Sequence, residues 1–356
     1  MGQPLKVAVV GAGISERHFA GFARLPELFE MTALCSLDVD RVAKLAAEHG
    51  VAHTTTSFDE VLAMDVDAVD ICTPPSLHWE MATKALDAGK HVIIEKPLFL
   101  SLAEVDAMAA RLETDDRRLM PIFQYRFGHA LQQLKHLVDS GIAGRHYLST
   151  VETHWERGPA YYAVPWRGTW AGEGGGCLLG HAIHAHDMLT HIVGAPTQIY
   201  ARTATLVNDI EVEDTAAATL DFADGSLATL SATLGSCGEI SRLRFCFEHL
   251  TAESHTKPYT PSRAPWTFTG RTPAVQAEID AALDAVATVG QGYARQFELF
   301  HAALTESAPL PVTIADARQS LELVTAAYAS AASGRAESLP IGPEHPLYGA
   351  WAPTDA

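Results

Sequence analysis

The sequence predicts an α/β domain built on a doubly wound parallel sheet, followed by an α+β domain with a mainly antiparallel sheet. In the first part of the chain, short β-branched runs alternate with helical patterns, as they do in βαβ units. Further along, strand-like runs follow one another with few helices between them. The length of 356 residues fits two ordinary domains.

The elements of the first domain are predicted from hydrophobic periodicity. Short β-branched and apolar runs predict strands at residues 7–10, 31–35, 68–72 and 92–94. Apolar residues at helical spacing predict helices at residues 17–24, 39–49, 77–88 and 102–112. Together they predict a doubly wound domain over residues 1–125.

A second domain is expected over residues 126–312. A helix at 130–138 precedes strand-like runs at residues 146–156, 198–207, 216–222, 226–234 and 242–247. Asp224-Gly225 separates two of these runs as a hairpin turn would. Residues 256–273, rich in Pro and Thr, are expected to form a long surface loop. A helix at 315–332 that stops at Gly334 is expected to pack back on the core, within a final segment over residues 313–356.

Composition and charge exclude several classes of function. The chain has 25 basic and 43 acidic residues, a net charge of −18 that repels nucleic acid and anionic lipid. Its beginning has no apolar run long enough to span a bilayer, so we expect a cytoplasmic protein with no membrane association. Buried, reduced thiols are expected for all five cysteines, which lie in apolar segments and form no CxxC pair: Cys35, Cys72, Cys177, Cys237 and Cys246.

A glycine-rich turn, GAGIS, lies directly after the first predicted strand and before a helix. Glycine there lets the backbone approach a pyrophosphate, and the N–H groups of the helix face the anion. The fingerprint is abbreviated, because Ser15 or Glu16 stands where a third glycine is usual; an ordinary Gly-rich turn is the alternative. We expect a Rossmann domain whose turn binds NAD(P) through Gly11, Gly13, Ile14 and Ser15.

The end of the second predicted strand indicates which nicotinamide cofactor is preferred. A Rossmann domain selective for NAD usually has an acid there, which binds the ribose 2′-hydroxyl. Here Ser36 leaves room for a 2′-phosphate that Arg41 or Arg17 could neutralise, although Asp38 could still reach the ribose. We expect a slight preference for NADP, with a solvated surface arginine as the alternative role of Arg41.

Three further motifs follow in order along the chain. ICTPPSLH contains Thr73, Pro74 and His78, and HVIIEKPLFLS places Glu95 and Lys96 at the carboxyl end of the fourth predicted strand. Open parallel sheets bind their ligands at this edge. The third motif is GEGGGCLLGHAIHAHD. In this combination the sequence resembles the Gfo/Idh/MocA family of sugar and inositol oxidoreductases, over nearly its full length.

The resemblance implies a Rossmann domain, a second domain with a large open-faced sheet, and a substrate pocket between them lined by Lys96 and His184. Family members commonly have an aspartate four residues before that histidine, where this chain has Gly180; part of its role could shift to His181. The resemblance also implies that Trp166 and Arg167 lie near the cofactor. We expect further cofactor contacts from Thr73, Pro74, His78, Glu95, Lys96 and Gln124.

The chemistry of these residues suits hydride transfer. Oxidation of an alcohol needs a base for the hydroxyl proton, and His184 has the suitable pKa range. Lys96 would stabilise the developing alkoxide by a hydrogen bond. His181, His184 and Asp187 recur every third residue and would share one helix face, which makes His181 and Asp187 candidates for substrate binding. A satisfied core histidine is the alternative for His184.

The same HxxHxHD string could also hold a metal ion, since imidazoles and carboxylates are zinc ligands. We expect no metal, because His186 lies off the shared face and hydride transfer needs none. Aromatic rings suit the apolar faces of sugars, although ordinary packing is the alternative for each one. The remaining substrate-binding candidates are Tyr125, Trp155, Tyr162 and Arg167.

The leading functional prediction is an NAD(P)-dependent dehydrogenase or reductase acting on a sugar, inositol or glycoside. One alternative is an enzyme that retains its NAD and cleaves a glycoside by oxidation and elimination. Another is a regulator that binds dinucleotide or sugar without turnover. The sequence does not indicate the exact substrate or the direction of reaction. A homodimer or homotetramer is implied by the resemblance alone.

Overall fold

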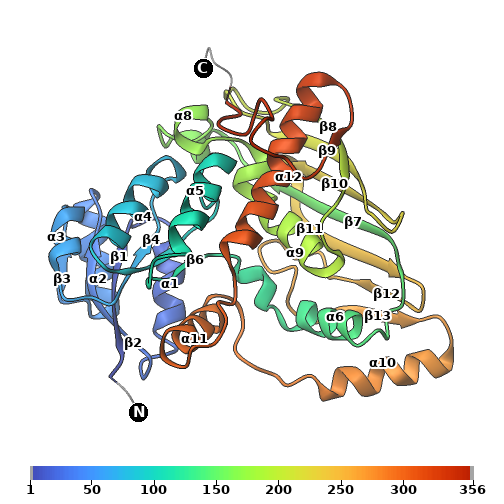
Figure 1. Cartoon of the computed structure of the whole chain (residues 1–356), viewed down its shortest axis with the longest axis horizontal. Helices are drawn as coiled ribbons and strands as arrows, with labels where there is room; N and C mark the ends of the chain where they lie inside the picture. Colours follow the sequence, from blue (N-terminus) through green and yellow to red (C-terminus); the bar gives the residue numbers. More distant parts are fainter. Residues whose placement is uncertain (1–2, 353–356) are drawn as a thin grey trace. The chain divides into compact units, whose positions relative to one another are not determined.

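The computed structural model describes residues 3–352 (Figure 1). The chain forms two compact units. The first contains the described residues up to Leu100 together with 104–124 and 290–317; the second contains 101–103, 125–289 and the chain from Arg318 onward. This division differs from the expected domain ranges by placing residues 290–317 with the first unit.

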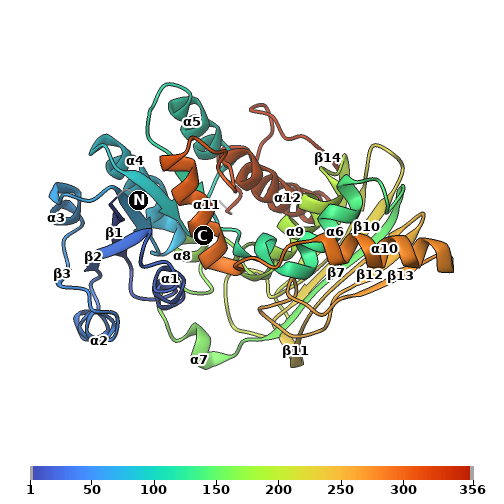
Figure 2. The same ribbon diagram turned by 90° about the horizontal axis from the view of Figure 1, so that it is seen from below.

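The first unit holds a six-stranded parallel sheet in the order β3-β2-β1-β4-β5-β6. Figure 2 shows α4 and α5 on one face of the sheet and α1 and α2 on the other. The strands are β1 (Leu5–Val10), β2 (Phe29–Cys35), β3 (His53–Thr55), β4 (Ala68–Ile71), β5 (His91–Ile94) and β6 (Leu119–Pro121). The helices are α1 (Ser15–Phe22), α2 (Val39–His49), α3 (Phe58–Ala63), η1 (Pro75–Leu77), α4 (His78–Asp87), α5 (Leu102–Leu112) and α11 (Gly292–Thr305).

The strand order changes direction between β1 and β4, which is the switch point of a doubly wound sheet. Ligands bind there because the loops after neighbouring strands diverge and leave a crevice. The prediction of a doubly wound parallel sheet is confirmed. The short strands β3 and β6 were not predicted, because three residues are too few to show a period.

The second unit holds an eight-stranded mixed sheet in the order β13-β12-β11-β7-β10-β9-β8-β14. Its pairs are antiparallel except for β7 and β10, which run parallel. The strands are β7 (His146–Glu156), β8 (Gln198–Ala204), β9 (Thr215–Asp221), β10 (Leu227–Thr233), β11 (Gly235–Phe247), β12 (Leu250–Glu253), β13 (Thr267–Gly270) and β14 (Glu337–Ser338). The predicted open-faced, mainly antiparallel sheet is confirmed.

Helices of the second unit gather on one face of this sheet, where α6 and α9 lie side by side (Figures 1 and 2). The other face carries exposed side chains that alternate with buried ones, as the period of two requires. The helical elements are η2 (Gln124–Phe127), α6 (His129–Asp139), α7 (Pro159–Tyr162), α8 (Trp170–Glu173), η3 (Cys177–His181), α9 (Ile183–Val193), α10 (Pro273–Ala285) and α12 (Ile314–Ser333).

Turn chemistry was predicted well in this unit. Asp224-Gly225 joins β9 to β10, with Gly225 at a φ of 82° and the Asp224 carboxylate accepting from the Ser226 N–H. Gly334 follows α12 with a φ of 67°, the left-handed region that favours glycine at a helix end.

Two sequence-based expectations are wrong. Residues 256–273 are not simply a loop, because β13 pairs with β12 and Thr272 caps α10 by accepting from the Val275 N–H. Residues 256–266 do lack helix and strand, so the expectation fails only for the part of the segment that forms β13 and the cap of α10. Cys237 is exposed and Cys246 half-buried, so only three of the five cysteines are buried.

Among residues 3–352, no helix combines the length and apolar character needed to span a membrane.

Helix α11 packs on α1, although most of the second unit separates them in sequence. Gly21 permits the close approach, since a Cβ there would lie 2.9 Å from the ring of Phe297. The rings of Phe22 and Phe297 stack with centroids 4.1 Å apart. This contact explains why residues 290–317 join the first unit.

We predict that Phe297→Ala lowers the free energy of unfolding by about 3–5 kcal/mol, because it leaves a cavity between the two helices. Phe297 is completely buried, whereas Leu206, with 73 % of its surface exposed, offers a matched control. Urea unfolding should show a small change for Leu206→Ala. Equal midpoints for Phe297→Ala and the wild type would contradict this packing.

Candidate functional site

The glycine-rich turn after β1 has a backbone that only glycine can form. Gly11 has a φ of 103°, and a Cβ there would lie 2.5 Å from the carbonyl oxygen of Cys72. Its N–H donates to the Cys35 carbonyl at 2.7 Å, so the turn is held between the ends of β2 and β4. Around Gly13, no atom lies within 4 Å of the position that a Cβ would take. The turn therefore leaves an open backbone at the switch point.

Ser15 begins α1 directly after this turn and is completely buried. Within the described part of the chain, its hydroxyl has no hydrogen-bond partner. A buried polar atom without a partner calls for a ligand or water, and the N–H groups of the first helical turn attract an anion. These features fit the pyrophosphate of a dinucleotide.

The predicted cofactor residues of the first unit follow the carboxyl ends of five parallel strands. Because the strands are parallel, these loops lie on one edge of the sheet. Trp166 belongs to the second unit. The others lie after β1 (Gly11, Gly13, Ile14, Ser15), β2 (Ser36, Arg41), β4 (Thr73, Pro74, His78), β5 (Glu95, Lys96) and β6 (Gln124).

The region after β2 has an excess of acid. Asp38 caps α2 by accepting from the Arg41 N–H at 3.1 Å, and the Arg41 guanidinium donates to the Gly13 carbonyl at 3.2 Å. A cavity of about 440 Å³ lies beside them. Its lining comprises four acids, two bases and a leucine: Glu16, Asp38, Asp40, Glu48, Arg41, Lys44 and Leu45. The acidic lining opposes the binding of a 2′-phosphate.

His78 joins the segments that follow β4 and β5. Its ring is buried, with Nε2 3.0 Å from the Thr73 carbonyl oxygen and Nδ1 2.9 Å from that of Pro97. Burial lowers the pKa of His78. Its ring thus links the segment after β4 to the segment after β5 through backbone carbonyls, and its predicted contact with the cofactor stays a prediction.

Lys96 is half-buried directly after β5. Its backbone N–H donates to the carboxylate of Glu95 at 3.0 Å. Lys96 belongs to the first unit and His184 to the second, and their convergence on one substrate stays a prediction.

The histidine segment of the second unit is not one regular helix. The π-helix η3 ends at His181 and α9 begins at Ile183. His184 and Asp187 lie three residues apart in α9, as predicted, but His181 belongs to the π-helix, so the prediction that all three share one α-helical face is wrong for His181. The three side chains have different surroundings.

His181 contacts the aromatic rings of Tyr161 and Trp155, with centroids 5.6 and 5.7 Å away. His184 stacks on Tyr125 at 4.5 Å. The structure thus brings the predicted base His184 together with the substrate-binding candidate Tyr125, and the substrate-binding candidates His181 and Trp155 together with each other. Both pairs lie wholly within the second unit.

Asp187 forms a buried ion pair with Arg126. The two carboxylate oxygens lie 2.8 Å from Nε and 2.6 Å from Nη2 of the guanidinium, a bidentate geometry that fixes both side chains. The Ser320 hydroxyl donates to the same carboxylate at 3.4 Å. Burial lowers the pKa of the neighbouring His186 to about 4, so its imidazole is neutral. Asp187 thus anchors α9 to η2, one residue from Tyr125.

Two arginines lie over the ring of Tyr161, the residue that contacts His181. The guanidinium of Arg167 lies 3.8 Å from the centroid of the Tyr161 ring, and that of Arg157 lies 5.2 Å from it. Burial raises the pKa of Tyr161 to about 12, and burial also raises the pKa of Tyr162. Both phenols are therefore neutral hydrogen-bonding groups. Sequence reasoning did not assign Arg157 a role, because it becomes recognisable only when β7 folds.

The buried carboxylate of Glu173 lies beside Gly180, since a Cβ on Gly180 would be 3.7 Å from its Oε1. Its other oxygen accepts from the Gly168 N–H at 2.7 Å. The carboxylate raises the pKa of both Tyr161 and Tyr162, after the larger effect of burial. No local pattern predicts this placement, because Glu173 comes from the separate helix α8.

Glu213 holds the start of η3. Its carboxylate accepts from the N–H groups of Gly176 and Leu178, both at 3.0 Å, and from the Tyr328 hydroxyl at 3.0 Å. A Cβ on Gly176 would lie 1.7 Å from the Glu213 carbonyl oxygen, so glycine is required there. Burial raises the pKa of Glu213 to about 7, against the opposing effect of these hydrogen bonds.

Sequence comparison places these features among known proteins. Residues 5–123 match the profile of an oxidoreductase family with an NAD-binding Rossmann fold, and residues 131–253 match the Gfo/Idh/MocA C-terminal domain. The fold and the glycine-rich turn thus define an oxidoreductase with an NAD-binding Rossmann domain. The chain belongs to the Gfo/Idh/MocA family.

Two curated relatives illustrate the similarity. The chain is 29 % identical over 237 residues to the uncharacterized oxidoreductase YrbE of Bacillus subtilis, covering 65 % of this chain and 67 % of the relative. It is also 29 % identical over 198 residues to the D-glucoside 3-dehydrogenase of Escherichia coli, covering 54 % of this chain and 55 % of that enzyme.

Among solved structures, the chain is similar to the WlbA dehydrogenase of Bordetella pertussis in complex with NADH and UDP-GlcNAcA. The TM-score is 0.84 at 27 % identity, over 95 % of this chain and 100 % of the other.

We predict that Gly11→Val abolishes the binding of NADH, because a side chain there collides with the Cys72 carbonyl and closes the turn. Fluorescence titration of NADH measures the loss. Gly342→Ala is the matched control, since no atom lies within 4 Å of its added Cβ. Unaltered NADH affinity in Gly11→Val would refute the assignment of this turn.

We predict that Glu213 makes the second unit less stable as pH rises. Its pKa is about 7 in the folded chain, above the ordinary glutamate value of 4.5, so its contribution is fully present below pH 4.5 and is lost as pH rises through 7. A difference of this size corresponds to about 3 kcal/mol. Urea unfolding of the wild type and Glu213→Gln between pH 5 and 8 should show a steeper decline for the wild type. Parallel pH curves would show the prediction to be wrong.

Proposed function

We propose that this protein is a nicotinamide-dependent oxidoreductase that transfers a hydride between the cofactor and a hydroxyl or keto carbon of a sugar, inositol or glycoside. One observation carries the proposal. Lys96 follows β5 on the same sheet edge where the Gly11 turn follows β1, so a residue that bears an amine and the dinucleotide turn belong to one edge of a single unit. Membership of the Gfo/Idh/MocA family supports the reaction class.

In the proposed mechanism, the Gly11 turn and Ser15 would hold a nicotinamide dinucleotide, which would supply the hydride-transfer chemistry. The imidazole of His184 takes the hydroxyl proton of an alcohol, and the Lys96 ammonium donates a hydrogen bond to the oxygen as negative charge develops on it. In the reverse direction, the His184 imidazolium donates its proton to the oxygen of a ketone while the Lys96 ammonium keeps its hydrogen bond to that oxygen. Stacking on Tyr125 restricts the rotation of the His184 ring and so orients its nitrogens.

We propose that the carbohydrate lies against the second unit. His181, Trp155 and Tyr162 supply polar groups and ring faces suited to a sugar, and Arg167 stands over the Tyr161 ring at their edge. Asp187 contributes indirectly, since its ion pair with Arg126 fixes α9. The E. coli relative described as a D-glucoside 3-dehydrogenase supports a carbohydrate substrate.

We propose NAD as the preferred cofactor, in place of the NADP preference expected from the sequence. Asp38 and three further acids line the cavity after β2, where a 2′-phosphate would be repelled. Arg41 is engaged by the Gly13 carbonyl and lies 4.0 Å from Glu16. The similar Bordetella structure contains NADH.

A homodimer or homotetramer is also part of the proposal. Large apolar side chains stand exposed on strands of the second sheet, where a second copy of the chain could cover them. They are Tyr147, Leu148, Tyr200 and Leu227. A cytoplasmic location stays a prediction.

We predict that Lys96→Ala and His184→Ala each lower kcat by about 100-fold or more while NADH still binds, because each removes one catalytic group. Turnover is measured with a panel of inositols, aldoses and glycosides and both nicotinamides. Lys84→Ala and His136→Ala, on exposed helix surfaces, serve as matched controls.

Wild-type rates in both catalytic variants would overturn the mechanism. Glycoside cleavage without added cofactor or net nicotinamide reduction would replace the dehydrogenase with the oxidation and elimination alternative. NADH binding without turnover on the whole panel would favour the regulator.

A further inference from the structure

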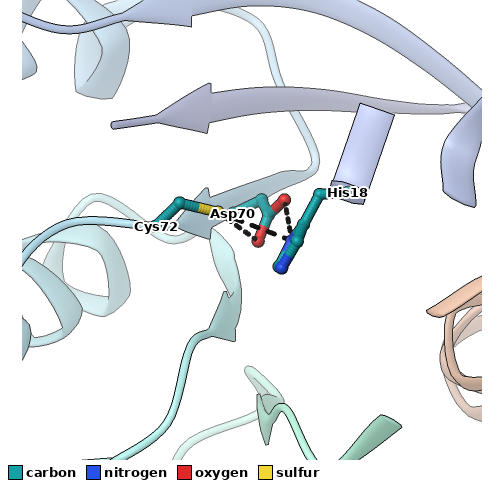
Figure 3. A group of neighbouring side chains, drawn as sticks. All are labelled: His18, Asp70 and Cys72. Atoms are coloured by element: carbon teal, nitrogen blue, oxygen red, sulfur yellow. Dashed lines mark hydrogen bonds and ion pairs between the residues drawn. The ribbon is translucent and has the colours of Figure 1, made fainter. Parts of the chain in front are cut away.

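A cluster of ionisable side chains is buried beneath the cofactor turn. His18 lies on α1, and Asp70 and Cys72 come from the end of β4 (Figure 3). The His18 Nδ1 lies 2.8 Å from an Asp70 carboxylate oxygen and 3.5 Å from the Cys72 sulfur. His18 and Asp70 are completely buried and Cys72 is 5 % exposed. The three side chains point toward one another within the first unit.

The other edge of the His18 ring faces β5. Its Nε2 lies 2.9 Å from a carboxylate oxygen of Glu95, which is 4 % exposed. The Tyr293 hydroxyl, brought by α11, donates to the same oxygen at 3.0 Å. The second Glu95 oxygen accepts from the Lys96 N–H. A continuous chain of contacts therefore runs from Asp70 through His18 and Glu95 to the backbone of Lys96.

The geometry favours a charged imidazole. A neutral histidine has one N–H, but both ring nitrogens of His18 face carboxylate oxygens that accept hydrogen bonds. Burial lowers the pKa of His18, but the charge of Asp70 and the contact with Cys72 outweigh it and leave the pKa well above its usual value. Burial raises the pKa of Cys72 to about 12, so the thiol is neutral.

Stability alone is a weak reason for such a cluster. Replacing buried ion pairs by apolar side chains of similar volume is often neutral or stabilising. The position of the cluster indicates a different role, because it ties together the ends of β4 and β5 at the edge where the dinucleotide turn and Lys96 lie.

We propose that His18 is a positioning residue for Lys96. Its imidazolium clamps Glu95 against Asp70, and the held carboxylate fixes the peptide from which the Lys96 side chain departs. The proposal rests on the proposed function of Lys96. It assigns a role in the reaction to a helix α1 side chain that need not touch cofactor or substrate.

The test compares His18→Gln with the wild type. Glutamine is polar and similar in size, but it has no charge and cannot place an N–H on both carboxylates. We expect kcat to fall at least 10-fold, with the KM for the nicotinamide changed less than 3-fold. His91→Gln is the matched control, because His91 lies at the opposite end of β5 and should leave kcat unaltered.

A double-mutant cycle separates positioning from general loss of stability. Because His18 acts through Glu95, the variant His18→Gln/Glu95→Gln should have a kcat close to that of Glu95→Gln alone. Multiplicative losses from the two substitutions would show that His18 acts by another route and would overturn the proposal.

Reactivity of the Lys96 amine gives a readout that does not need a substrate. Trace acetylation with acetic anhydride, followed by peptide mass spectrometry, compares Lys96 with Lys84 as an internal standard. We expect His18→Gln to change the relative labelling of Lys96 at least 3-fold and His91→Gln to leave it constant. Constant labelling in His18→Gln would overturn the proposal, whatever substrate the enzyme has.

The acetylation measurement separates the proposed role of His18 from the proposed oxidoreductase function, because the labelling of Lys96 can change even where no sugar is oxidised. Should His18→Gln fail to fold, Tyr293→Phe removes a second donor to Glu95 without changing charge. Tyr293→Phe should change the labelling of Lys96 by less than the 3-fold expected for His18→Gln. Constant labelling would again contradict the proposal. Stoichiometric zinc in the purified wild type would also overturn it, because the ion would take the nitrogen, oxygen and sulfur atoms that now contact one another.

Discussion

The contact between the Gly11 turn and the end of β4 is the constraint on which the first unit depends. The carbonyl oxygen of Cys72, the residue after β4, lies 2.5 Å from the position that a Cβ at residue 11 would take. This close approach leaves the backbone open above the sheet and places α1 directly over the strand ends. The same strand end provides Asp70 and Cys72, which lie beside His18 of α1. The glycine-rich turn and the cluster of His18, Asp70 and Cys72 therefore both depend on the packing of the end of β1 against the end of β4.

In the second unit, a close backbone contact at a glycine and a buried carboxylate likewise hold the segment that carries the histidines. Gly176 lies against the Glu213 backbone, and the Glu213 carboxylate satisfies N–H groups that the irregular start of η3 leaves unpaired. A buried acid costs free energy unless its oxygens are hydrogen-bonded, and here three donors face it. The arrangement orients the π-turn that carries His181 before α9 begins. A close backbone contact and a buried carboxylate thus stabilise the irregular start of this helical segment.

Sequence reasoning predicted the parts of the fold that depend on local patterns. Val39–His49 and His146–Glu156 have the predicted boundaries, because long amphipathic or alternating runs define their own ends. It failed where distant segments decide the outcome. Glu173 reaches Gly180 from another helix, and Tyr293 reaches Glu95 from nearly 200 positions away. Lys96 was recognisable from its motif, whereas the π-turn after Gly176 changed the expected grouping of His181 with Asp187.

The return of α11 to the first unit makes the nucleotide-binding half of the protein discontinuous along the chain. During synthesis, the whole parallel sheet leaves the ribosome long before Phe297 is made, so the apolar side of α1 around Phe22 has no final cover in the meantime. The intervening second unit is complete in large part by then. The first unit can therefore complete its packing only after most of the second unit has been synthesised, although most residues of the first unit come earlier in the chain.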